Sequence, residues 1–335
     1  MLIFIAVVLA IFLALAGLPM LISTTPLPGL AAPHELATPD SHFVTIPFEG
    51  TDGIELHYLA GGREDGPGAS NFLLLHGFTF NAFTWNDLLE AFGEHGRVVA
   101  YDQPPYGLSA KLVPSDWRGA GPYTREAAVV QLFALMDALA MERAVLVGNS
   151  AGGSLALEAA LARPDRIEGL ILLDPWVYVR RPTLPRALAS QPQFARLSIW
   201  LARALGRSDA LLRRSYADPA RITPERRRLS GIHAQVHNWD LAWGALLHRS
   251  LTDAVAVSAR LDEIARPTLV LSGAEDRLVP LSDSERVVAS IPGASLAVLP
   301  GCGHMPQEEC PALVREALSA WLSDQKFLRE GLDSR

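Results

Sequence analysis

The chain has 335 residues, 49% of them hydrophobic, and a formal net charge of -7. This length and apolar content predict one large or two small domains with a sizeable core, and they exclude a disordered chain. The negative charge argues against nucleic-acid binding, which needs a basic face. With only Cys302 and Cys310, the chain is no disulfide-rich scaffold, and the cysteines lack the number and spacing of a zinc site. They form either one disulfide or, as we favour, two small buried thiols.

The N-terminal 22 residues carry no charged side chain. At about 1.5 Å per residue they would span roughly 30 Å as a helix, so we predict a single-pass membrane anchor and a membrane localisation. The first basic residue beyond is Arg63, which leaves the sidedness open. One alternative is a cleaved signal peptide and a secreted protein, because residues 14–16 and 29–31 fit the small-residue cleavage pattern. Others are a merely buried helix and a misassigned start codon. Residues 23–41 contain four prolines and predict an extended linker.

The next segments alternate between strand and helix patterns. Residues 42–48 and 54–59 alternate apolar and polar side chains, which predicts an opening hairpin. Short apolar runs that predict buried strands follow at 72–75, 98–101, 144–147, 170–173, 268–271 and 296–299. Helical patterns lie between them at 124–141, 150–162, 282–291 and 311–322. This order predicts the α/β class, with a mostly parallel sheet covered by helices on both faces.

An arginine-rich segment interrupts this alternation. From Trp176 to Arg249 there are 13 Arg, no Lys and four acidic residues, a net charge of +9. Residues 176–261 are helical in character and predict an inserted cap, which leaves 42–175 and 262–326 as the core. The arginines could bind an acidic substrate or anionic lipid. For any single arginine we favour a solvated surface position, since the whole chain has 27 Arg and two Lys.

The strongest chemical signal is the Gly148-Asn149-Ser150-Ala151-Gly152 sequence, a G-x-S-x-G between a strand run and a helix pattern. Its glycines allow a tight strand-to-helix turn that presents Ser150 at the helix N-terminus, where N–H groups and the helix dipole favour negative charge. The alternative is a serine cap of an ordinary turn. We predict that Ser150 is a nucleophile.

A serine hydroxyl needs a general base, and that base needs an orienting carboxylate. His304 follows the last strand run on a glycine-rich loop, and Asp276 follows the strand before it. The order Ser150, Asp276, His304 is that of the α/β-hydrolase architecture. Asp174, which ends another strand, and Glu275 are alternatives to Asp276. The oxyanion donors expected are the backbone N–H groups of Phe78 and Ala151.

These residues lie in motifs that resemble the α/β-hydrolase superfamily over residues 42–324. The motifs are Leu75–Phe78, Tyr101–Ser109, Gly148–Gly153, Gly273–Asp276 and Gly301–His304. In the second motif, Pro105 replaces the first glycine of the family pattern. The resemblance implies an eight-stranded sheet, a cap inserted after strand six, and neither a cofactor nor a metal.

The resemblance, together with Ser150 at the elbow, favours a serine hydrolase that cleaves a carboxylic ester of a small hydrophobic or amphiphilic substrate through an acyl-enzyme. One alternative is a carbon–carbon bond hydrolase of the meta-cleavage type, which Gly148-Asn149-Ser150 resembles; those enzymes commonly have Trp after the catalytic histidine, where this chain has Met305. Another is a non-catalytic receptor on the same fold. The sequence leaves the acyl length and the oligomeric state undefined.

Overall fold

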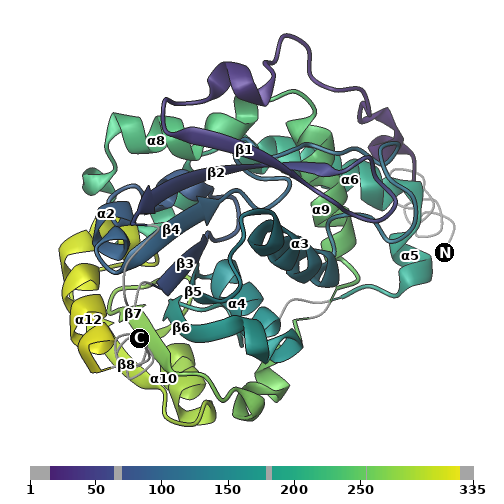
Figure 1. Ribbon diagram of the computed structural model, residues 1–335. Coiled ribbons are helices and arrows are strands. Elements are labelled where there is room, and N and C mark those ends of the chain that lie inside the picture. The colour runs from purple at the N-terminus through teal and green to yellow at the C-terminus, as the bar shows by residue number, and fades with distance from the viewer. Residues whose placement is uncertain (1–15, 64–69, 179–182, 254, 325–335) are drawn as a thin grey trace, which may run out of the picture.

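The computed structural model describes residues 16–63, 70–178, 183–253 and 255–324, which surround one sheet of eight strands in the order β1-β2-β4-β3-β5-β6-β7-β8 (Figure 1). The opening hairpin consists of β1 (Ser41–Ile46) and β2 (Ile54–Gly62). The other strands are β3 (Ser70–Leu75), β4 (Gly96–Tyr101), β5 (Ala144–Asn149), β6 (Ile167–Leu173), β7 (Thr268–Gly273) and β8 (Ser295–Leu299). Strand β2 pairs antiparallel with both neighbours and the remaining pairs are parallel, which confirms the predicted sheet.

Helices cover both faces of the sheet. Figure 1 shows α2 (Leu89–Gly93) and α12 (Pro311–Asp324) on one side, and α3 (Arg125–Ala138) and α4 (Ala151–Ala162) on the other. In β5, Val145 and Val147 pack with the first pair of helices, whereas Leu146 packs with the second. A strand buried on both faces needs apolar side chains at consecutive positions, which explains its continuous apolar run. Helix α10 (Leu281–Ser290) packs against β7 and β8.

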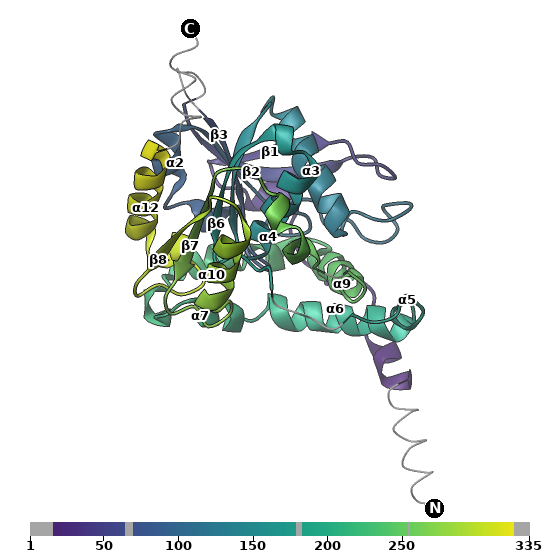
Figure 2. The ribbon, with the colours of Figure 1, turned by 90° about the horizontal axis from the view of Figure 1, so that it is seen from below.

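The chain between β6 and β7 is helical where the structure describes it. It contains α5 (Arg186–Ala189), α6 (Pro192–Gly206), α7 (Ala210–Ser215), α8 (Pro224–Ser230) and α9 (Trp239–Ser250). Figure 2 shows α6, α7 and α9 along one end of the sheet layer. There α7 contacts the loop that follows β8, since the carbonyl of Ser215 accepts a hydrogen bond from the His304 backbone. These helices therefore cover the carboxyl ends of the strands.

The prediction of a membrane anchor, with its membrane partner and localisation, is wrong. Of the apolar stretch, residues 1–15 lie outside the described residues, and the part that follows forms one short 3-10 helix, η1 (Leu18–Leu21). Across the described residues, no helix has both the length and the apolar character needed to cross a bilayer. The carbonyls of Met20 and Ile22 accept hydrogen bonds from Arg196 on α6, so this segment packs against the folded domain.

Candidate active site

Ser150 lies at the turn between β5 and α4, in a backbone conformation that L-residues rarely adopt. Its φ and ψ are 55° and -116°, and the residue is 3% exposed. The turn is tight because its neighbours are glycines. A Cβ atom on Gly148 would lie 2.5 Å from the carbonyl oxygen of Gly152, and one on Gly152 would lie 2.3 Å from that of Leu75. Backbone strain at Ser150 is thus maintained by close packing that only glycine permits.

The packing around Gly152 gives a stability prediction. Gly152→Ala forces a methyl group against backbone atoms of β3, and we expect a loss of roughly 1–3 kcal/mol in the free energy of unfolding, measured by urea denaturation. Gly231→Ala is the matched control, because a Cβ there meets its nearest atom at an ordinary 3.4 Å. Equal losses in the two variants would contradict the role assigned to Gly152.

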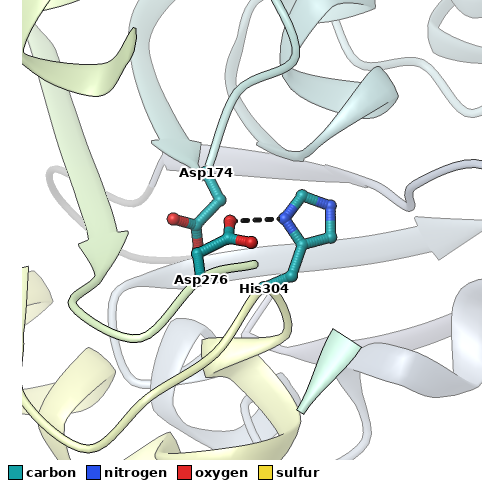
Figure 3. A group of neighbouring side chains, drawn as sticks. All are labelled: Asp174, Asp276 and His304. Atoms are coloured by element: carbon teal, nitrogen blue, oxygen red, sulfur yellow. Dashed lines mark hydrogen bonds and ion pairs between the residues drawn. The ribbon is translucent and has the colours of Figure 1, made fainter. Parts of the chain in front are cut away.

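His304 and Asp276 form the hydrogen-bonded pair expected of a base and its orienting acid. The Nδ1 atom of His304 lies 2.6 Å from Oδ2 of Asp276 (Figure 3). The other carboxylate oxygen of Asp276 accepts hydrogen bonds from the backbone of Leu278 and Val279. With Nδ1–H directed at the carboxylate, Nε2 is the ring nitrogen that can accept a proton. The histidine is 3% exposed, so its orientation is held in a largely water-excluded site.

Asp174 is a second buried carboxyl group beside this pair. Its Oδ1 accepts hydrogen bonds of 3.0 Å from the hydroxyl of Ser272 and the backbone of Gly273. One carboxylate oxygen from each of Asp174 and Asp276 and one ring nitrogen of His304 all lie within 4.8 Å of one another. Burial, and then the charge of Asp276, raise the pKa of Asp174 well above its usual value. The imidazole of His304 donates its hydrogen bond to Asp276, and the alternative Glu275 is exposed.

Among the residues that the structure describes, Asp174, Asp276 and His304 are also the group whose donor atoms lie close enough together to hold a metal ion. The donor set fits a metal poorly, because the imidazole Nδ1 is already bonded to Asp276 and Asp174 accepts two hydrogen bonds through Oδ1. The arrangement therefore fits a hydrogen-bonded His–Asp pair better than a metal site.

Two residues that the sequence did not single out hold the His304 loop. The amide of Asn149 donates to the backbone carbonyl of His304 at 3.0 Å, which connects the Ser150 turn to the histidine. The buried carboxylate of Glu309 accepts from the backbone of Gly303 at 2.7 Å and from Ala217 and Asp218 beyond α7. An acidic residue at the end of a short helical turn gives no local sign of such contacts, because Ala217 and Asp218 are distant in sequence.

The favoured prediction of two buried thiols is wrong, because Cys302 and Cys310 form a disulfide. The single helical turn α11 (Pro306–Glu309) folds the chain back after His304 and brings the two Cα atoms to 6.0 Å. The bridge closes the loop that carries His304. Its covalent closure restricts the loop's alternative conformations.

The loop after β3 lies against Ser150. A Cβ atom on Gly77 would be 3.2 Å from the Cβ of Ser150. His76 supports this loop: Nδ1 bonds the carbonyl of Gly77 at 2.7 Å, and Nε2 accepts from the backbone of Gln103 at 3.0 Å. Burial lowers the pKa of His76, which favours the neutral ring that these bonds require.

The two residues predicted to supply the oxyanion hole meet in one small cavity. Phe78 and Ala151 both line a cavity of about 170 Å³ between the sheet and α9. Tyr106 and Tyr123 also line it. The structure thus brings Phe78 from the loop after β3 together with Ala151 at the start of α4.

Residues 72–317 match the model of the alpha/beta hydrolase family, and the chain belongs to this family. It is a hydrolase on the α/β fold. It is 26% identical to an uncharacterized hydrolase, YugF, of Bacillus subtilis, over 81% of this chain and 95% of that protein. It is 30% identical to the 2-hydroxy-6-oxo-6-phenylhexa-2,4-dienoate hydrolase of Burkholderia cepacia, over 80% and 91%. A thermophilic esterase from Thermogutta terrifontis superposes with a TM-score of 0.64 at 27% identity, over 84% and 98%.

Proposed function

We propose that this protein is a serine hydrolase that cleaves a carboxylic ester, with Ser150 as nucleophile, His304 as general base and Asp276 as the orienting acid. The observation that carries the proposal is the buried His304–Asp276 hydrogen bond on the loops that follow β7 and β8, beside a strained serine turn. Residues 176–261 act as the cap over this site. Because such a site needs only its own side chains and water, no cofactor is part of the proposal.

The reaction proceeds in two steps. His304 takes the hydroxyl proton of Ser150 as the oxygen attacks the ester carbon, and the charge on the carbonyl oxygen is stabilised by the N–H groups of Phe78 and Ala151. Collapse releases the alcohol, which receives the proton from His304, and leaves an acyl group on Ser150. His304 then activates water, which releases the acid and restores the serine. Asp276 keeps Nδ1 protonated and stabilises the imidazolium that forms twice.

The relatives support two kinds of substrate. The Thermogutta esterase supports an ester, and the Burkholderia relative, named for a dienoate, supports carbon–carbon bond hydrolysis as a second candidate. Met305 favours the ester. It is fully buried in a cluster with Phe80, Leu212 and Tyr216, at the position where the carbon–carbon hydrolases commonly have Trp.

The test compares p-nitrophenyl acetate, butyrate and octanoate with 2-hydroxy-6-oxo-6-phenylhexa-2,4-dienoate, together with labelling by a fluorophosphonate probe and mass spectrometry of the labelled peptide. We expect ester turnover and a probe adduct on Ser150, because the same activated hydroxyl performs both reactions. Turnover of the dienoate alone would select the second candidate. An adduct on Ser150 without turnover of either class would favour a receptor role.

A further inference from the structure

The segment that precedes the sheet is tied to the cap, and we call residues 16–37 the strap. Arg196 and Arg203 on α6 donate hydrogen bonds of 2.5–3.0 Å to four strap carbonyls, those of Met20, Ile22, Ser23 and Thr25. Gln193, on the same helix, donates to the carbonyl of Ala16. Side chains of α6, a helix of the cap, therefore bind the backbone carbonyls in the first half of the strap.

The second half of the strap pairs with the chain just before α9. Ala31 forms a parallel bridge with Val236, with hydrogen bonds of 2.9 Å to Gln235 and from His237. Leu27 and Leu30 pack against the buried cluster of Tyr106, Ala202, Trp239 and Trp243. The strap precedes residues 72–317, the part that matches the family. It is therefore an element that the family match does not account for.

The strap forms one wall of the larger of two neighbouring cavities. This cavity has a volume of about 830 Å³, in the range of sites that enclose a small ligand. Thr24 and Pro26 of the strap line it, with Trp117 and Tyr123 from the loop before α3. The remaining walls come mainly from α5, α6 and α9. Most of the side chains there are small or apolar (Ala189, Ala195, Ile199, Leu241, Gly244 and Ala245), and the ionisable ones are Arg186, His248 and Arg249.

This cavity adjoins the smaller one that Phe78 and Ala151 line, next to the turn that carries Ser150. Tyr123 lines both, and α9 contributes neighbouring residues to each: Ala245 to the larger, and Leu246 and Leu247 to the smaller. The smaller cavity, at about 170 Å³, is below the roughly 300–1,000 Å³ that is typical of small-ligand sites. The larger cavity is the adjacent space with apolar walls, and a bulky substituent of the substrate would extend into it.

We propose that the larger cavity binds the apolar acyl group of the substrate, and that the strap, held by Arg196, sets how large a group is accepted. The substrate class is then an ester with one bulky apolar arm. The assignment of an ester rests on the proposed function. The cavity and the position of the strap are observed independently of that reaction. Arg196 acts through the strap and is a positioning residue.

The first test narrows the cavity. In the full chain, Ala245→Phe should lower kcat/KM for p-nitrophenyl octanoate about tenfold and leave the acetate nearly unchanged, because the side chain projects into space that only the longer group uses. Ala195→Leu, from α6, tests the same space from another wall if Ala245→Phe fails to fold. An unchanged octanoate-to-acetate ratio in a folded variant would overturn the proposal.

The second test loosens the strap. Arg196→Met removes two hydrogen bonds to strap carbonyls and should lower the octanoate-to-acetate ratio through a higher KM for octanoate, with kcat for acetate retained. Arg196 is chosen because Arg203 also pairs with the buried Asp240. Arg213→Met, an exposed position on α7 outside the larger cavity, is the control. Equal loss on both esters in Arg196→Met would indicate a merely structural role and overturn the assignment.

A binding measurement separates this proposal from the proposed reaction. The Ser150→Ala protein should bind the fluorescent fatty acid cis-parinaric acid, and adding Ala245→Phe should weaken binding about tenfold. If esters are not hydrolysed but this binding behaves as expected, the cavity assignment stands and the reaction is wrong. If esters are hydrolysed but probe binding is unaffected by Ala245→Phe, the cavity assignment is wrong and the reaction stands.

Discussion

Ser150→Ala is expected to reduce kcat/KM for p-nitrophenyl esters by at least about 10³-fold, because the variant has no hydroxyl to form the acyl-enzyme. The oxyanion donors remain, so KM should change much less than kcat. The loss is measured by steady-state kinetics on short and long esters. All of them release p-nitrophenol, so their rates can be compared directly. Labelling by a fluorophosphonate should disappear in the same variant.

The matched control is Ser154→Ala, one turn further along α4. The Ser154 hydroxyl donates to the carbonyl of Trp176, so the change removes a buried serine hydroxyl near the site without removing the proposed nucleophile. We expect a loss of stability and continued labelling. Labelling retained in Ser150→Ala would show that another residue reacts, and the assignment of the nucleophile would have to be abandoned.

The parts of the fold that follow from local patterns could be predicted from sequence. The apolar run at 144–147 lies within β5, which is buried on both faces, and the alternating residues 42–48 and 54–59 correspond to the β1–β2 hairpin. The turn at Ser150 was predictable for the same reason, since its glycines and its strained serine are adjacent in the chain. Steric requirements between residues that are adjacent in the chain restrict which residue types can occur there, so they can be recognised in the sequence.

Features that depend on distant partners could not be predicted. Nothing in the strap sequence reveals that Arg196, far along the chain, binds its carbonyls. The apolar residues 1–22 matched the length of a bilayer, and hydropathy alone does not show that Met20 and Ile22 bind α6. The pairing of Cys302 with Cys310 likewise depends on the turn made by α11. The position of Asp174 beside Asp276 depends on the neighbouring strands β6 and β7.

Asp276→Asn is expected to lower kcat by about 10³–10⁴-fold, because the amide cannot hold the imidazole with its proton on Nδ1 or stabilise the imidazolium. The hydrogen bond of 2.6 Å between His304 and Asp276 is the contact that is changed. Kinetics at saturating ester should show the loss in kcat, with KM close to that of the parent. A loss of only a few-fold would mean that another carboxyl group orients His304, and Asp174 is the candidate within 4.8 Å.

Asp174→Asn tests which of the two acids, Asp174 or Asp276, acts as a charged group beside His304. Asparagine has nearly the same shape as aspartic acid but carries no charge. Burial and the Asp276 charge raise the pKa of Asp174, so we expect it to keep its proton at pH values where an exposed Asp is ionised. The neutral amide then imitates the native group, and kcat should stay within about threefold of the parent at pH values where Asp174 keeps its proton. A large loss would show that Asp174 acts as a charged group.

The stability of the same variant has a defined dependence on pH. A carboxyl group with a raised pKa in the folded state keeps a proton that the unfolded chain releases above about pH 4, so it destabilises the fold increasingly as pH rises toward the folded-state pKa. Asp174→Asn removes this penalty. Its free energy of unfolding relative to the parent, measured by urea denaturation between pH 4 and 8, should therefore increase with pH. A difference that falls with rising pH would mean that the native site favours ionised Asp174, and both carboxylates would then belong to the charged machinery around His304.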